Sequence, residues 1–132
     1  MGPGRRGREP RCPFCMEKVA RPRPSAEAEG SLCSPETAWG RCGCGAIYLL
    51  DATGKQGGEV LLQALTMLAG GDQERGLALR SGVDYELEFL PYDPRTHRTA
   101  GDAGGRPRYG QPRLWFARRR HPAAWEGDDG PP

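Results

Sequence analysis

Four cysteines stand in two close pairs that could bind one metal ion. Two residues separate Cys12 from Cys15, and one residue separates Cys42 from Cys44. A tetrahedral zinc ion takes four thiolates at about 2.3 Å, and two short chain turns can each supply two of them. The spacing predicts a metal site formed by these four residues, with Zn²⁺ as the expected ion and iron, alone or as a cluster, as the alternative. Ordinary cysteines or a disulfide are the competing interpretation.

The fifth thiol, Cys33, lies between the two pairs. It could replace Cys42 or Cys44 as a ligand, act as a reactive thiol, or be a small buried side chain. Tight pairs favour metal coordination over a secreted disulfide framework. The basic N-terminal stretch is not followed by the apolar segment of a secretory signal, so we expect a cytoplasmic protein with reduced thiols.

The residues next to the cysteines are typical of metal-binding turns. Pro13 follows the first cysteine, and Gly45, which suits a left-handed backbone, follows the last. Residues 11–51 thereby resemble a zinc ribbon, the rubredoxin-like module in which a hairpin joins two cysteine turns. The resemblance implies four ligands: Cys12, Cys15, Cys42 and Cys44. The chain departs from it at Met16, where zinc ribbons usually have glycine, and in the CxC second turn, where they usually have CxxC; the second departure leaves the ligands of that turn open.

Strong core-forming residues are scarce in this chain. Its 132 residues carry a net charge of +2, and Gly and Pro together number 33. Leu, Ile, Val and Phe make up about 14% of the chain, below the roughly 20% under which disorder is expected, although disorder usually also requires a high net charge. The length favours one domain. A large apolar core and an integral membrane protein are both excluded, so we expect the metal to contribute to folding.

Hydrophobic periodicity predicts an α+β fold. Residues 59–69 have leucines at i, i+4 and i+7 and end before two glycines, which predicts an amphipathic helix. Residues 85–89 alternate as a half-buried strand, and residues 46–50 form a short strand after the last cysteine. Asp72 could cap a short second helix over residues 73–80. The expected fold is a small zinc-ribbon β-hairpin with one main helix and an additional amphipathic strand, between flexible termini.

Composition divides the chain into three parts. Residues 1–11 are predicted to be a disordered basic arm, and residues 12–92 a zinc-ribbon-containing α+β domain. Residues 93–132 are predicted to be a Gly/Pro/Arg-rich loop and a C-terminal basic segment. Within this last part, residues 114–116 provide a final apolar anchor.

Charge is segregated along the chain. Residues 1–24 carry a net +5 and residues 93–132 a net +3, on either side of an acidic middle. Mobile arginines can neutralise phosphates without reading sequence. Residues 113–120 mix aromatic and cationic side chains, which suits nucleic acid but equally suits a terminal strand that packs on the domain. The candidate nucleic-acid-binding residues are Arg5, Arg6, Arg8, Arg118, Arg119 and Arg120.

Weaker signals favour structural roles. Residues 54–58 lie between a strand and a helix, where phosphate can bind, but a flexible turn is the preferred interpretation. His97 and His121 are predicted surface residues, and Trp39 is predicted to pack around the metal turn, with base stacking as the alternative. A four-thiolate site has no open position for a substrate, and no other catalytic grouping stands out, so we do not expect an enzyme.

The function predicted from these features is that of a zinc-binding, non-enzymatic adaptor that contacts nucleic acid or a nucleoprotein complex through basic arms. One alternative is a protein–protein interaction module of a larger complex, favoured by the acidic middle of the chain. Another is a rubredoxin-like iron protein that carries electrons. The sequence gives no indication of the oligomeric state.

Overall fold

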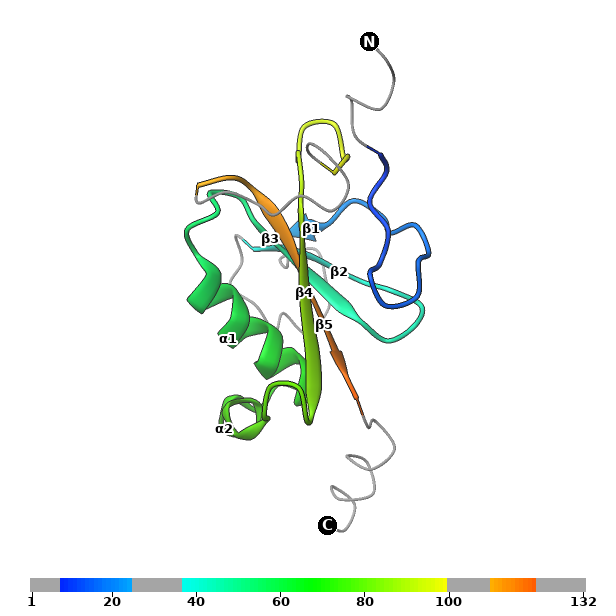
Figure 1. Cartoon of the computed structure of the whole chain (residues 1–132). Helices are drawn as coiled ribbons and strands as arrows, with labels where there is room; N and C mark the ends of the chain where they lie inside the picture. Colours follow the sequence, from blue (N-terminus) through cyan, green and yellow to red (C-terminus); the bar gives the residue numbers. More distant parts are fainter. Residues whose placement is uncertain (1–7, 25–36, 100–109, 121–132) are drawn as a thin grey trace.

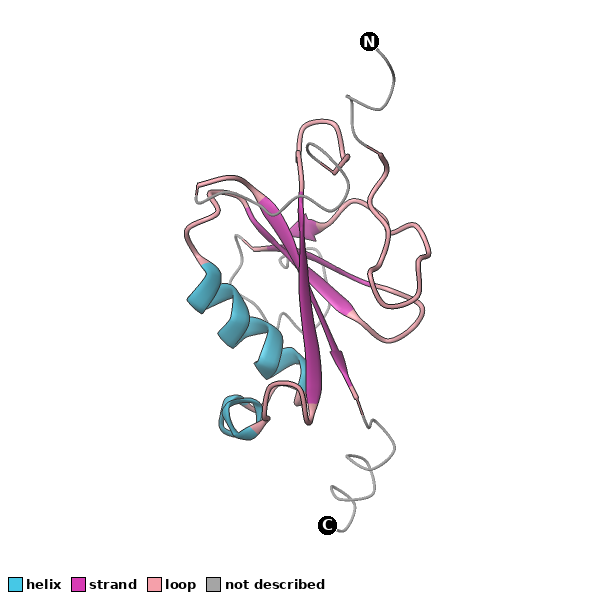
Figure 2. Ribbon diagram, in the orientation of Figure 1, coloured by secondary structure: helices cyan, strands magenta, loops and turns pink. Residues whose placement is uncertain are grey.

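The computed structural model describes residues 8–24, 37–99 and 110–120. In these residues five antiparallel strands form one sheet in the order β1-β2-β3-β5-β4, accompanied by two helices (Figures 1 and 2). The strands are β1 (Arg23–Pro24), β2 (Ala38–Arg41), β3 (Ile47–Asp51), β4 (Tyr85–Pro91) and β5 (Arg113–Arg119). The helices are α1 (Gly57–Leu68) and α2 (Gln73–Ala78). The predicted α+β class agrees with this architecture.

Strand β5 is an inner strand of the sheet. It pairs with β3 on one side, where Leu49 faces Trp115, and with β4 on the other, where Phe89 faces Trp115. The sequence-based boundary after residue 92 left this segment outside the domain. The structure pairs this segment with β3 and β4 in the same sheet. Its apolar core of four residues between arginines was too short to identify an inner strand from composition.

Helix α1 covers one face of the sheet, here called the helix face. Its buried residues pack against alternate residues of β3, β4 and β5, among them Ile47, Leu49 and Tyr85. The helix confirms the one predicted over residues 59–69, and it ends before Gly70 and Gly71, which both have positive φ. The apolar side chains that recur every two residues along the strands and about every 3.6 residues along the helix thus pack into one core.

The opposite face of the sheet is covered by residues 8–24, and we call it the N-terminal face. Tyr48, Leu114 and Phe116 lie on it and form a second buried cluster with Cys12, Val19 and Tyr92. Both faces of β3 are therefore buried, which explains its continuous apolar run. Figure 1 shows the sheet between α1 on one side and the N-terminal segment on the other.

Tyr48 fastens the N-terminal segment to the sheet. Its hydroxyl donates a hydrogen bond of 2.8 Å to the carbonyl of Ala20. Its ring lies over Gly40 of the paired strand β2, where a Cβ atom would come within 2.4 Å of the ring. Glycine at this position therefore leaves the space that the tyrosine ring occupies.

The loop between β3 and α1 is a turn closed by a buried carboxylate. Asp51, with no exposed surface, accepts hydrogen bonds from the N–H of Gly54 at 2.9 Å and from Nε1 of Trp115 at 3.4 Å. Gly54 has a φ of 71° and lies against the backbone of Gln111. These contacts give Gly54 a structural role, in agreement with the preferred interpretation of residues 54–58 as a turn.

Candidate metal centre

The first cysteine turn, residues 12–16, is held by its own backbone. The N–H of Met16 donates to the carbonyl of Cys12 at 2.8 Å, and the N–H of Phe14 donates to the sulfur of Cys12 at 3.4 Å. Met16 has a φ of 68°, the left-handed conformation that glycine adopts at lower cost. The non-glycine residue thus preserves the backbone geometry of the turn.

The second cysteine turn, residues 42–45, joins β2 to β3. The N–H of Cys42 donates to the carbonyl of Ala46 at 2.8 Å, and the N–H of Gly45 donates to the carbonyl of Cys42 at 3.0 Å. Gly45 has a φ of 99°, which confirms the expected left-handed backbone. The hairpin places both sulfurs of the CxC pair toward the first turn, so its shorter spacing does not remove either residue from the cluster.

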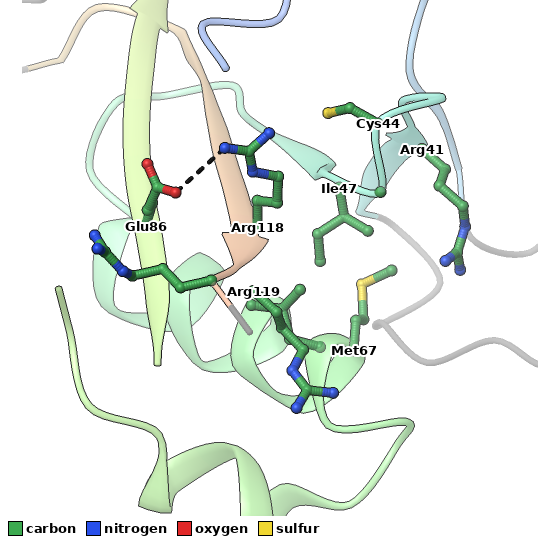
Figure 3. Close-up of a pocket in the computed structure, with 10 residues that line it drawn as sticks. Arg41, Cys44, Ile47, Met67, Glu86, Arg118 and Arg119 are labelled. Atoms are coloured by element: carbon green, nitrogen blue, oxygen red, sulfur yellow. Dashed lines mark hydrogen bonds and ion pairs between the residues drawn. The ribbon is translucent and has the colours of Figure 1, made fainter. Parts of the chain in front are cut away.

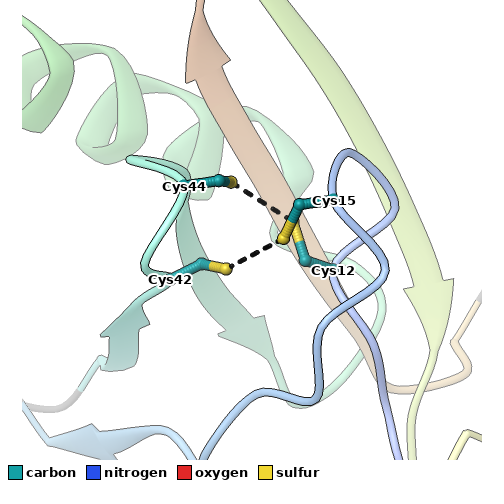
Figure 4. A group of neighbouring side chains, drawn as sticks. All are labelled: Cys12, Cys15, Cys42 and Cys44. Atoms are coloured by element: carbon teal, nitrogen blue, oxygen red, sulfur yellow. Dashed lines mark hydrogen bonds between the residues drawn. The ribbon is translucent and has the colours of Figure 1, made fainter.

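The four sulfurs come together as one cluster (Figure 4). Cys12 Sγ lies 3.8 Å from Cys44 Sγ, and Cys15 Sγ lies 3.5 Å from Cys42 Sγ. All four lie within 4.8 Å of one another. Four sulfurs at 2.3 Å from a central ion would be about 3.8 Å apart. The observed separations suit a single ion, and they are far longer than the roughly 2.05 Å of a disulfide.

Burial sets the protonation of these thiols. Desolvation raises the pKa of Cys12 to about 12, against the opposing effect of the Phe14 N–H, and it also raises the pKa of Cys42. For Cys44 burial acts in the same direction, but hydrogen bonds from the Ala46 N–H and the neighbouring thiols outweigh it and lower its pKa to about 7. Four neighbouring thiolates, two of them buried and two half-buried, would repel one another, whereas a bound dication would stabilise all four.

Arg118 connects the cluster to the sheet. Its guanidinium lies 4.7 Å from the centroid of the Phe14 ring and donates to Glu86 Oε2 at 3.3 Å. Burial disfavours its charge, but hydrogen bonds to Glu86 and Cys44 outweigh this effect and raise the pKa of Arg118. Arg118 was predicted to lie on a basic arm, but it is a half-buried residue of β5.

The other predicted nucleic-acid-binding residues fall into two groups. Arg119 belongs to β5, and Arg120 is exposed and donates its backbone N–H to the carbonyl of Asp84. Arg8 is exposed and exchanges hydrogen bonds with Thr99. Arg5 and Arg6 lie outside the described residues, as does Cys33. None of these positions tests the prediction of nucleic-acid binding.

His97 is a link between segments, where a surface role was expected. It has a φ of 58°, its Nε2 lies 3.0 Å from the carbonyl of Val19, and its Nδ1 lies 2.7 Å from the hydroxyl of Tyr92. Since a carbonyl can only accept, Nε2 donates and Nδ1 accepts from the tyrosine. The histidine therefore ties the N-terminal segment to the residues that follow β4. His121 lies outside the described residues.

No protein-family model, curated protein or solved structure matches the chain. The interpretation of the cysteine cluster consequently rests on its own geometry and chemistry. Among the residues described, no helix has both the length and the apolar character needed to cross a membrane.

Proposed function

We propose that the protein is a non-enzymatic zinc protein in which the four clustered cysteines bind one Zn²⁺ as thiolates. The separation of their sulfurs, 3.5 Å and 3.8 Å across the two turns, carries this proposal. Four protein ligands leave no open coordination position, so the ion has a structural role. It cross-links the N-terminal segment to the β2–β3 hairpin. The site requires reduced thiols, the condition maintained in the cytoplasm.

Metal analysis of the purified protein tests this proposal. We expect about one zinc per chain and a colourless solution, whereas a mononuclear ferric site would be coloured.

Chelation should lower the melting temperature, because binding free energy in such sites is also folding free energy. Cys12→Ser should behave like the chelated protein, and Cys33→Ser is the matched control that should change little. A protein that keeps its circular dichroism and melting temperature after chelation contradicts the proposal.

We further propose that this zinc protein contacts nucleic acid as an adaptor. The segregated arginines at the two ends of the sequence support this role, and so does the gathering of four arginines at one end of the sheet. The acidic middle of the chain instead favours a protein partner. A binding titration with nucleic acid at low and moderate salt decides between them, because phosphate contacts weaken steeply with salt. Absence of binding at low salt would favour the protein–protein module.

A further inference from the structure

A pocket of about 390 Å³ opens beside the second cysteine turn, where β3 begins and both α1 and β5 end. Arginines from two strands and the residue that follows β5 surround it, and its floor is formed by Ile47 and Met67, which are 2% and 7% exposed. Figure 3 shows Arg41 and Arg118 on opposite sides of Ile47, with Met67 below. Its volume lies within the roughly 300–1,000 Å³ typical of small-molecule sites. We call this site the arginine pocket.

The lining of the arginine pocket is predominantly cationic. Glu86 is its one carboxylate, and it pairs with Arg118 at 3.3 Å. Arg118 also contacts Cys44, so its charge is matched by acidic groups of the pocket itself. Arg41 and Arg120 are exposed residues that add positive charge from other segments. The pocket therefore presents an excess of positive charge beside an apolar surface.

The end of α1 places partial negative charge near the same pocket, because the last carbonyls of a helix lack partners within the helix. Here the carbonyls of Leu65, Thr66 and Met67 accept hydrogen bonds from the N–H groups of residues 69–71. These bonds satisfy the carbonyls that would otherwise compete with an anion for the arginines. The partial negative charge of the helix end still opposes an anionic ligand, so the arginines of the pocket have to outweigh it.

We propose that the arginine pocket binds one nucleotide of a single-stranded nucleic acid. The guanidinium groups of Arg41 and Arg120 contact the phosphate, and an edge of the base contacts the small apolar floor at Met67, which is 7% exposed. Arg118 holds Glu86 and the metal turn in position. A base can enter such a pocket only when it is unstacked, which favours a single strand over a duplex. This inference rests on the proposed nucleic-acid function and assigns the contact to the folded domain, where the sequence suggested mobile arms.

Fluorescence anisotropy with a labelled oligothymidine of about ten nucleotides tests the proposal on the zinc-loaded full chain. We expect Arg41→Gln to raise the dissociation constant about tenfold at low salt, as for a lost charged hydrogen bond. It should also reduce the slope of log K against log salt by about 0.7, the contribution of one phosphate contact on a single strand. Glu86→Gln should instead tighten binding, because it removes the negative charge from the pocket.

Arg95→Gln is the matched control. It makes the same change of charge at a side chain that is 88% exposed, beyond the far end of β4. We expect it to leave the affinity within twofold and the salt slope unchanged. Melting temperatures of the variants equal to that of the parent protein exclude misfolding as the cause of any loss.

The outcomes separate this inference from the proposed function. Equal losses from Arg41→Gln and Arg95→Gln would show attraction by net charge alone and overturn the pocket, while nucleic-acid contact would stand. Equal affinity for a duplex of the same length would also overturn it. No binding of the parent protein at low salt would remove both the nucleic-acid function and the pocket. Competition by a mononucleotide at lower concentration than by inorganic phosphate would support the contact with the base.

Discussion

At the scale of single residues, two left-handed positions shape the cysteine turns. Gly45 has a φ of 99° and Met16 a φ of 68°, each next to the second cysteine of its turn. Glycine adopts this conformation without strain, whereas methionine does so at a cost of about 1 kcal/mol or more. The two turns thus use similar backbone geometry with different local stability.

Met16→Gly should therefore stabilise the zinc-loaded protein by up to about 1 kcal/mol, as judged by the free energy of unfolding in urea. The Met16 side chain is 61% exposed, so its removal loses little burial. Gly45→Ala is the opposite change at the matching position, and no atom lies within 4 Å of the added Cβ. We expect it to destabilise by a similar amount through backbone strain alone. A loss of stability in Met16→Gly would show that its side chain contributes more than its exposure indicates.

At the scale of elements, β3 is buried on both of its faces and contributes residues to both apolar clusters. Tyr48 on its N-terminal face has 1% of its surface exposed, and burial, with a smaller effect of the Cys42 charge, raises its pKa to about 12. A tyrosine in an unfolded chain ionises near pH 10. Between about pH 10 and 12 the unfolded chain loses a proton that the folded chain keeps, so stability falls as the pH rises through this interval.

Tyr48→Phe should remove the contribution of Tyr48 to this pH dependence, while Tyr92, whose pKa burial also raises, keeps its own. At pH 8 we expect the substitution to cost about 1 kcal/mol, because the hydrogen bond to the Ala20 carbonyl is lost. As the pH rises from 10 to 12, the parent protein should lose of the order of 2 kcal/mol through Tyr48 that the variant does not lose, so the two stabilities should become equal and then cross. Denaturation at a series of pH values measures this. Parallel pH profiles for the two proteins would contradict the raised pKa.

Some of these structural elements could be predicted from the sequence, and others could not. Residues 59–69 and 85–89 were predicted because each has one apolar face with a clear period, and both elements are present as α1 and β4. The cysteine cluster was predicted because ligand chemistry restricts the spacing of its residues. The inner position of β5 and the packing of Arg118 on Phe14 were missed. Both depend on pairing between distant segments, and an arginine-flanked strand resembles a solvent-exposed arm.

At the scale of the whole molecule, Cys12 and Cys42 of the cysteine cluster belong to one of the two apolar clusters and not to the other. The cluster on the helix face joins α1 to the sheet and includes no cysteine, whereas the cluster on the N-terminal face includes Cys12 and Cys42. β5 contributes residues to both, because alternate side chains point to opposite faces. Many of the few apolar residues of the chain thus lie on strands that contribute side chains to both clusters.

The placement of β5 leads to a test of the domain boundary. A chain that ends at residue 92 keeps all four clustered cysteines but lacks the strand that joins β3 to β4. It also lacks Leu114, Phe116 and Ala117, each with no exposed surface. Losing one large core side chain costs about 2–5 kcal/mol, and the loss of Leu114 and Phe116 together with both strand pairings would exceed the stability of most small domains. We therefore expect this chain to show no cooperative unfolding transition even with zinc present, as measured by circular dichroism during heating.

A chain that ends at residue 120 is the control, since it retains β5 and should unfold cooperatively. Cooperative unfolding of the shorter chain would instead mean that residues 12–92 fold on their own, as composition alone suggested.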